Sequence, residues 1–345
     1  MPSPSSATHH KIDRLRHGGI MTNYQCNAAC RHCLYACAPE RSGGYIVPEK
    51  AAEICRLLLE GGCRSVHIGG GEPFLNIDGL IMLLETARNS GITVEYVETN
   101  AFWAEDESRA VEYLCMLKKT GMDTLCISLD PFHAEYVPAA LPIKLAELCR
   151  REGFGCFLWQ DKYRGVLSRL KAPHRAYTRA ELERELSANY VLETAQAYGL
   201  SMGGRALSIE AEYGVLKPVA EILGYVPGSQ GGSAVKKRPC LNLLDSGHFH
   251  VDLHGWYIPP GCTGIVFPLE EAVRGVPLGK YPAFDALVTG GVVALFELAV
   301  GLGFEAEAAY TSRCALCFHL RCWLSKLEGF VELDGEHYVA ALMYC

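Results

Sequence analysis

The sequence predicts an α/β protein, a partial (β/α)6 barrel followed by a small, cysteine-rich C-terminal domain. Short apolar, β-branched runs alternate with amphipathic runs from Ile20 to about Arg205, which is the pattern of repeated βα units around a parallel sheet. The alternation stops at a stretch rich in Gly, Pro and Ser at 226–234. Six of the 16 cysteines lie beyond that stretch. The last third of the chain should therefore form a structure of its own.

The elements of the barrel follow from the same alternation. We expect strands at 20–24, 65–68, 93–97, 124–129, 155–159 and 200–204. We expect helices at 48–60, 77–89, 106–119, 143–152 and 178–198. In folds of this kind the chemistry collects at the carboxyl ends of the strands, on the loops that follow them.

The domain boundary should fall near Lys236, where the barrel pattern has ended and the C-terminal cysteines begin. We therefore expect a flexible lead-in at 1–19, the barrel at 20–235 and the cysteine-rich domain at 236–345. The lead-in carries His, Lys and Arg without the apolar region that a signal peptide needs. This favours a cytoplasmic protein.

Charge and hydropathy limit the partners. The formal net charge of -7 gives no general attraction for nucleic acid or for an anionic membrane. The longest apolar stretches, such as 290–303, are shorter than the ~20 residues that a membrane-spanning helix needs. We expect neither a nucleic-acid partner nor a membrane. A reducing cytoplasm also argues against disulfides, so some of the cysteines should bind metal.

Three cysteines, Cys26, Cys30 and Cys33, lie within eight residues directly after the first expected strand. Thiolates at this density suit zinc or an iron-sulfur cluster. A structural zinc site usually takes four ligands, and Cys37 is a possible fourth. Three ligands alone favour a 4Fe-4S cluster with one open iron.

This CxxxCxxC segment resembles the cluster loop of the radical S-adenosylmethionine (AdoMet) superfamily, and the resemblance runs over about 20–205. It implies that Cys26, Cys30 and Cys33 hold a catalytic 4Fe-4S cluster whose open iron binds AdoMet. An electron delivered through the cluster then cleaves AdoMet to a 5'-deoxyadenosyl radical. His32 stands where the family commonly has an aromatic residue, and its ring could stack or hydrogen-bond near the adenine.

A glycine-rich turn, Gly69-Gly70-Gly71-Glu72-Pro73, follows the second expected strand. Glycines let the backbone approach a ligand closely, and a carboxylate or carbonyl there can accept from an ammonium group. The turn resembles the GGEP motif of the superfamily, which binds the amino group of AdoMet. Taken alone, such a turn is more often a plain strand-to-helix connection.

Polar residues at later strand ends resemble weaker family motifs. Thr99 and Asn100 follow the third expected strand, and Ser128 and Asp130 follow the fourth. The resemblance implies contacts with AdoMet or substrate, although Thr99 and Asp130 singly also suit helix N-caps. Arg205, after the sixth expected strand, could pair with the AdoMet carboxylate.

The C-terminal cysteines resemble the SPASM or twitch extension of the superfamily, which holds auxiliary 4Fe-4S clusters. The six candidate ligands are Cys240, Cys262, Cys314, Cys317, Cys322 and Cys345. A full SPASM set would have another cysteine shortly after Cys322, so one auxiliary cluster is the economical interpretation. Its ligands are either the first four of these or the last four. A zinc ribbon is the alternative.

The resemblance implies an enzyme that abstracts hydrogen from its substrate, with a peptide or protein to be modified as the first hypothesis. A small-molecule dehydrogenase or rearrangement enzyme is the second, since the fold does not select between them. A non-catalytic iron-sulfur or zinc protein is the third, and the turn at 69–73 argues against it. The implied partners are an electron donor such as flavodoxin or ferredoxin and the substrate itself.

Overall fold

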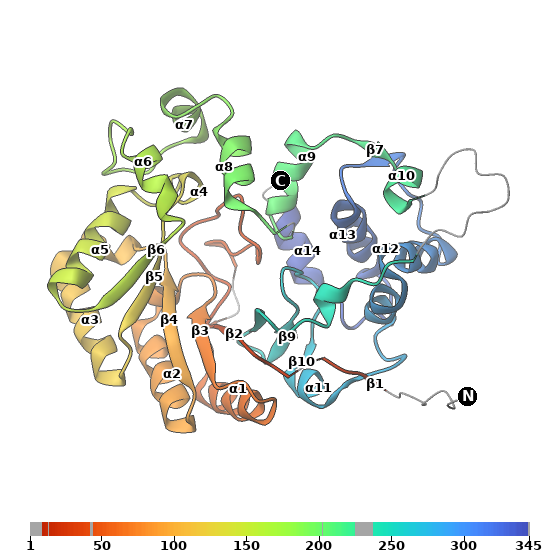
Figure 1. The fold of residues 1–345 in the computed structure, drawn as a ribbon, viewed down its shortest axis with the longest axis horizontal. Coiled ribbons are helices and arrows are strands. Elements are labelled where there is room, and N and C mark those ends of the chain that lie inside the picture. Colours follow the sequence, from red (N-terminus) through yellow and green to blue (C-terminus); the bar gives the residue numbers. More distant parts are fainter. Residues whose placement is uncertain (1–8, 13, 42–43, 202, 225–236, 344–345) are drawn as a thin grey trace.

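A computed structural model describes residues 9–12, 14–41, 44–201, 203–224 and 237–343. An eight-stranded sheet in the order β10-β9-β8-β2-β3-β4-β5-β6 forms its centre (Figure 1). The six strands from β8 to β6 run parallel, and β9 and β10 continue the sheet antiparallel. Their bounds are β2 (Gly18–Met21), β3 (Ser65–Gly69), β4 (Thr93–Thr99), β5 (Thr124–Ser128), β6 (Gly155–Trp159), β8 (Phe249–Val251), β9 (Trp256–Ile258) and β10 (Phe267–Pro268). The expected α/β class with a largely parallel sheet is confirmed.

Four helices connect successive strands and lie along the outside of the sheet in Figure 1. They are α1 (Pro48–Glu60), α2 (Ile77–Ser90), α3 (Glu107–Thr120) and α5 (Ala140–Arg151). Side chains cap two of them, because Asn76 accepts from the Gly79 N–H and Asp106 from the Arg109 N–H. These helices agree with the sequence-based expectation to within a few residues.

The helix expected at 178–198 is two helices, α7 (Arg179–Glu185) and α8 (Tyr190–Tyr198). Thr178 and Glu181 form a reciprocal capping box that starts α7. The remaining short helices before residue 225 are α4 (Pro131–Ala134), α6 (Arg164–Leu167), α9 (Ala206–Tyr213) and α10 (Val219–Leu223).

The sixth strand expected at 200–204 is not formed in the residues that the structure describes there. The backbone there instead crosses the segment that carries Cys26, Cys30 and Cys33, which we call the cysteine loop. A Cβ atom on Gly204 would lie 2.1 Å from the carbonyl oxygen of Leu34, directly after Cys33. The sixth parallel strand is β8, which pairs with β2 on its other side. The expectation of six parallel strands is therefore met by a strand from the C-terminal third.

The C-terminal third packs against the β2–β8 side of the sheet (Figure 1). Its helices are α11 (Leu269–Arg274), α12 (Pro282–Gly301), α13 (Arg313–Leu324) and α14 (Gly335–Leu342). Two short antiparallel pairs join distant segments, β1 (His9–His10) with β11 (Val276–Pro277) and β7 (Lys217–Pro218) with β12 (Ala309–Tyr310). The boundary expected near Lys236 lies outside the described residues, and the division into two domains stays a prediction.

Part of the expected lead-in is anchored. β1 pairs with β11, and the side chain of Leu15 is buried in the core, with its N–H donating to the carbonyl of Gly61. The strand pairing of β1, the buried side chain of Leu15 and its backbone hydrogen bond thus hold this segment against the rest of the protein.

Helix α12 is long and apolar enough, by length and composition, to be a candidate membrane span. Of its most apolar window, 56% is buried inside the protein. Gly291 interrupts it with a φ of 66°, and a Cβ atom there would lie 1.9 Å from the carbonyl oxygen of Arg238. The buried share and the interruption favour a kinked core helix.

Candidate functional site

A cavity of about 560 Å³ opens at the carboxyl ends of the parallel strands. The cysteine loop, the glycine-rich turn and the ends of β4, β5 and β6 line it. Of the residues predicted for the barrel site, those lining it are Cys26, Cys30, His32, Cys33, Gly70, Gly71, Glu72, Thr99, Asn100, Ser128 and Arg205. Gly69, Pro73 and Asp130 lie in the same region behind the lining residues.

The three thiols of the cysteine loop are electrostatic neighbours. Burial first, then the charges of Glu72, Cys30 and Cys33, raise the pKa of the Cys26 thiol. A hydrogen bond with the Cys37 thiol and the Arg205 guanidinium, acting against burial, hold the pKa of Cys33 well below its ordinary value. The loop therefore gathers soft ligands on one wall of the cavity.

Cys37 lies next to this set. Its side chain is buried, its N–H donates to Sγ of Cys33 at 3.3 Å, and its own Sγ contacts the carbonyl oxygen of Gly70 at 3.7 Å. A fourth thiol thus lies beside Cys33, as the zinc interpretation with Cys37 expects.

The glycine-rich turn is packed against the segment that leads into the cysteine loop. The N–H of Gly71 donates to the carbonyl of Asn23 at 2.8 Å, and a Cβ atom on Gly71 would lie 1.9 Å from the carbonyl oxygen of Gln25. Gly70 has a φ of 137°, which L side chains rarely adopt. Glycine is required here because two stretches of backbone touch.

Glu72 fixes the turn to the end of β4. Its buried carboxylate accepts from Thr99 Oγ1 at 2.9 Å, the Asn100 N–H at 2.8 Å and the Phe74 N–H at 3.2 Å. Burial raises the pKa of Glu72 to about 7, and these donors oppose the rise. Both carboxylate oxygens are thus engaged within the protein.

Asn100 links the end of β4 to the cysteine loop. Its Nδ2 donates to Oδ1 of Asn27 at 2.8 Å and lies 3.8 Å from Sγ of Cys26. An amide directed at a sulfur is the kind of contact that tunes a thiolate-bound cluster.

Asp130 serves two histidines and a helix end. Its carboxylate caps α4 through the N–H groups of Phe132 and His133, and it lies 2.7 Å from Nδ1 of His133 and 3.7 Å from Nε2 of His32. Burial lowers the pKa of His133, but Asp130 and Cys30 outweigh it and raise that pKa well above the ordinary value. Asp130 thus positions groups that face the cavity.

His32 packs among aromatic rings, as expected for an aromatic position. Its ring centre lies 5.1 Å from that of Phe132 and 4.9 Å from that of Tyr198. Burial lowers its pKa to about 4, so the ring is neutral at physiological pH. Its Nδ1 is buried with no hydrogen-bond partner among the described residues, which suits a donor or acceptor brought by a ligand.

Arg205 holds the cysteine loop from behind. Its side chain is only 1% exposed, and it donates to the carbonyl oxygens of Cys30 at 2.9 Å and Cys37 at 2.6 Å. Its backbone N–H donates to the carbonyl of Cys33. The guanidinium predicted for the AdoMet carboxylate is thus directed at the backbone of the loop.

Several cavity residues were not predicted. Those from β4, β5, β6 and the end of α8 include Tyr96, Glu98, Cys126, Trp159, Gln160, which directly follows β6, and Tyr198. Tyr96 and Glu98 are two residues apart on β4, so the period of a strand could have placed both side chains on the same face of the sheet. His248 and His250 come from β8 and the residues before it. The sequence carries no local signal that this segment joins the barrel.

In the C-terminal third, the first four predicted cysteines are electrostatic neighbours. Burial, then the charges of Cys262 and Cys314, raise the pKa of Cys240. Burial raises the pKa of Cys317 to about 12, while Arg321 opposes the rise and Cys262 and Cys240 add to it.

The remaining two predicted cysteines stand apart or cannot be placed. Cys314 and Cys317 are three residues apart on α13, while Cys322 is five residues further along. At about 100° per residue it faces away from Cys317 by roughly 140°. Cys345 lies outside the described residues.

Residues 20–158 match the family model described as "Radical SAM superfamily". A probable GTP 3',8-cyclase of Methanococcus maripaludis is 30% identical over 111 residues, which is 32% of this chain and 35% of that protein. The putative peptide biosynthesis protein YydG of Bacillus subtilis is 25% identical over 135 residues, or 38% and 41% of the two chains. The matched part thus spans 35% and 41% of the length of these two curated relatives.

Among solved structures, Streptococcus suis SuiB bound to S-adenosylmethionine is 16% identical, covers 89% of this chain and 77% of its own, and superposes with a TM-score of 0.43. The structure of anSMEcpe with bound AdoMet is 14% identical over 96% of this chain and all of its own, with a TM-score of 0.41.

Proposed function

Because residues 20–158 of this chain are a domain of the radical SAM superfamily, we propose that the protein is an enzyme that reductively cleaves AdoMet and abstracts hydrogen from a peptide or protein substrate. One observation carries the proposal. The thiols of Cys26, Cys30 and Cys33 line the same cavity as the glycine-rich turn.

The donor set fits a cluster and its ligand. Cys26, Cys30 and Cys33 would hold a 4Fe-4S cluster, which would supply an electron for cleavage of bound AdoMet to methionine and a 5'-deoxyadenosyl radical. The chain contributes the surroundings. The buried Arg205 guanidinium adds positive charge beside the loop, which favours the thiolate form of Cys33.

The residues around the thiols position the site. Glu72 holds the turn to β4, and Asn100 directs an amide at Cys26. We assign the adenine side of the cavity to His32, whose neutral ring offers one unpaired nitrogen, stacks on Phe132 and packs at a tilt against Tyr198. We assign the amino-acid part of AdoMet to the backbone of Gly70 and Gly71, which lines the cavity.

The substrate assignment is the finer part of the proposal. The name of the Bacillus relative, a putative peptide biosynthesis protein, favours a peptide, and the name of the Methanococcus relative favours a small molecule. Trp159, on the cavity wall, is 46% exposed and donates from Nε1 to the Tyr198 hydroxyl at 2.7 Å. An exposed aromatic at the edge of a cavity is a good contact for a peptide chain. A small-molecule dehydrogenase is the second candidate.

In the C-terminal third we propose one auxiliary 4Fe-4S cluster held by Cys240, Cys262, Cys314 and Cys317. Their mutual electrostatic influence favours this set over one that includes Cys322. A zinc ion on the same thiols is the alternative, and iron analysis separates the two.

The central experiment measures 5'-deoxyadenosine released from AdoMet by anaerobically reconstituted protein, with dithionite and then with flavodoxin or ferredoxin as reductant. We expect release by the parent protein and none by Cys30→Ala, which lacks one of three cluster ligands. Cys115→Ala is the matched control because Cys115 is exposed on α3, and it should behave as the parent does. Equal release by Cys30→Ala would refute the proposal.

The peptide assignment is tested separately. The protein is incubated with AdoMet, reductant and any short peptide encoded beside its gene, and the peptide is examined by mass spectrometry. A mass change that requires AdoMet and Cys30 supports a peptide substrate. Turnover of a small molecule with every neighbouring peptide unchanged contradicts it and leaves the cleavage chemistry intact.

A further inference from the structure

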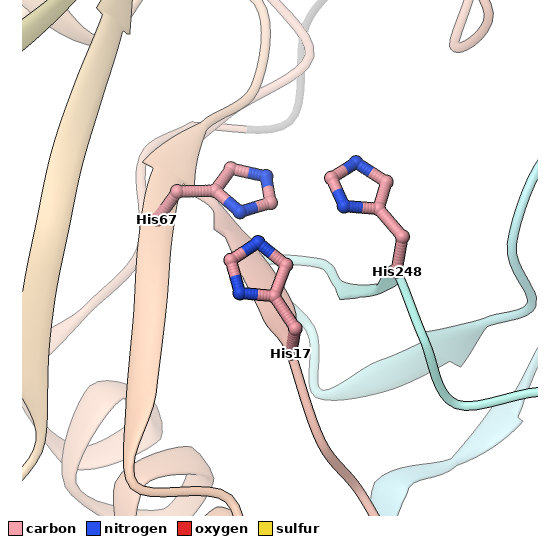
Figure 2. A group of neighbouring side chains, drawn as sticks. All are labelled: His17, His67 and His248. Atoms are coloured by element: carbon pink, nitrogen blue, oxygen red, sulfur yellow. The ribbon is translucent and has the colours of Figure 1, made fainter.

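Three histidines outside the cysteine loop face one another beside the central sheet. His17 directly precedes β2, His67 lies on β3, and His248 directly precedes β8. Figure 2 shows the three rings turned toward a shared space, each with a nitrogen facing it. One ligand nitrogen of each ring lies within 4.8 Å of the other two. Because β2 lies between β3 and β8, the sheet brings these distant positions together.

The spacing of the rings suits one metal ion. The ring centres are 5.4 Å apart for His17 and His67, 5.0 Å for His67 and His248, and 5.5 Å for His17 and His248. The middle of such a triangle lies about 3 Å from each ring centre. A Zn–N bond of about 2.0–2.1 Å plus a ring radius of about 1.1 Å gives nearly the same separation.

The outer nitrogens of two rings are already occupied, which leaves the inner ones for a ligand. Nε2 of His67 faces Nε2 of His250 at 3.0 Å, and its Nδ1 is buried without a hydrogen-bond partner in the part of the chain that the structure describes. Nδ1 of His17 lies 3.5 Å from a carboxylate oxygen of Glu95. A carboxylate behind a ligating histidine fixes the ring and raises its basicity.

Two of the rings, those of His67 and His248, have surroundings that favour the neutral form, which binds metal. Burial first, then the charges of His250 and His248, lower the pKa of His67 well below its ordinary value. Burial and His17 lower the pKa of His248. Neutral imidazoles carry the lone pair that a cation needs, and they suit zinc and similar transition metals better than magnesium or calcium.

We propose that His17, His67 and His248 bind one divalent transition-metal ion of the zinc type, with a further coordination position open toward the cavity that His248 lines. Three protein ligands with an open position are typical of catalytic zinc sites, whereas structural sites are closed by four. The open position takes an oxygen or nitrogen atom of a substrate. This site uses none of the thiols proposed for the iron-sulfur clusters, although its open position faces the cavity that Cys26, Cys30 and Cys33 also line.

The test uses the full-length protein with its iron-sulfur clusters assembled. The protein is incubated with Zn²⁺ and desalted, its zinc content is measured, and X-ray absorption at the zinc edge identifies the ligands. We expect one zinc per chain with nitrogen or oxygen neighbours at about 2.0 Å. His17→Ala and His248→Ala should each lose this zinc. His174→Ala, which changes an exposed histidine elsewhere, should keep it.

Two outcomes would overturn the proposal. The parent protein could retain no zinc, or it could hold zinc with sulfur neighbours at about 2.3 Å that survives both histidine changes, which would place the ion on cysteines. Unchanged iron and sulfide contents identify the variants that fold. If either alanine variant does not fold, His248→Gln replaces it in the test. His248 is exposed, and glutamine has a similar size.

Discussion

The cysteine loop and the C-terminal thiols each lie beside one buried arginine, but the two arginines have different partners. Arg205 donates to two backbone carbonyls of the cysteine loop itself. Arg321, which is 4% exposed, donates to the Thr263 carbonyl at 2.6 Å and the Tyr338 hydroxyl at 2.9 Å. In the first region the arginine holds the backbone of the segment that carries the candidate ligands. In the second it holds the surrounding framework and also hydrogen-bonds the side chain of one candidate ligand, Cys317.

The two regions also differ in how their thiols are brought together. Cys26, Cys30 and Cys33 belong to one short segment, whereas Cys240, Cys262, Cys314 and Cys317 come from three segments of the chain. A local set depends on the conformation of one loop. A distributed set depends on the packing of the whole C-terminal third.

The largest expected effect separates the two regions completely. Changing Cys26, Cys30 and Cys33 to Ala should abolish AdoMet cleavage while about four irons and equal sulfide remain bound, as one auxiliary 4Fe-4S cluster requires. Adding Cys314→Ala and Cys317→Ala should remove this iron. Metal analysis checks both steps. One zinc and no iron in the triple variant would contradict the auxiliary cluster.

The second prediction concerns the two arginines. Arg205→Met leaves two buried carbonyls of the loop without their donor, which should destabilise the protein by about 2–3 kcal/mol in denaturant unfolding and remove AdoMet cleavage. Arg321→Met should instead lower the iron bound in the triple cysteine variant and spare AdoMet cleavage. Loss of both properties in both variants would mean that the regions are coupled.

A third prediction tests the contact between the glycine-rich turn and the cysteine loop. Gly71→Ala should destabilise the protein by about 1–3 kcal/mol and reduce the iron bound by the loop, because the new Cβ meets the Gln25 carbonyl. Gly165→Ala is the control, since nothing lies within 4 Å of a Cβ atom there. Equal stability of the two variants in thermal unfolding would show that the turn can move aside.

The smallest effects are expected at two cysteines outside the proposed ligand sets, Cys37 near the loop and Cys322 on the same helix as Cys314 and Cys317. Cys37→Ser should keep the iron of the loop and most of the AdoMet cleavage, and Cys322→Ser should keep the auxiliary iron. Iron analysis and 5'-deoxyadenosine release measure both. Loss of metal in Cys37→Ser would favour the four-thiol zinc interpretation of the loop.

The comparison also explains what the sequence could predict. Helices α1, α2 and α3 were predicted closely because Pro, Asn or Asp marks their starts and their apolar faces repeat with helical period. The cysteine loop could be singled out from the sequence because its three candidate ligands are close together in the chain. The histidines of the proposed metal site could not be, because only the pairing of β2 with β8 brings His248 beside His17.

One error has the same origin. The expected strand at 200–204 contains Gly203 and Gly204, and apolar neighbours made it resemble the other strands. The contact of Gly204 with the Leu34 carbonyl is a long-range feature that no local pattern reports. Arg205, predicted as a residue of the site, lines the cavity, and its side chain is directed at the Cys30 carbonyl.

The pairing of β2 with β8 has a consequence for synthesis of the protein on the ribosome. β2 leaves the ribosome long before its partner β8, because residues 22–248 lie between the two strands in the chain. During that interval one edge of an apolar, fully buried strand lacks its partner, and such an edge is prone to pair with other chains. A nascent chain that ends near residue 236 should therefore need a chaperone to stay soluble, and completed chains should not.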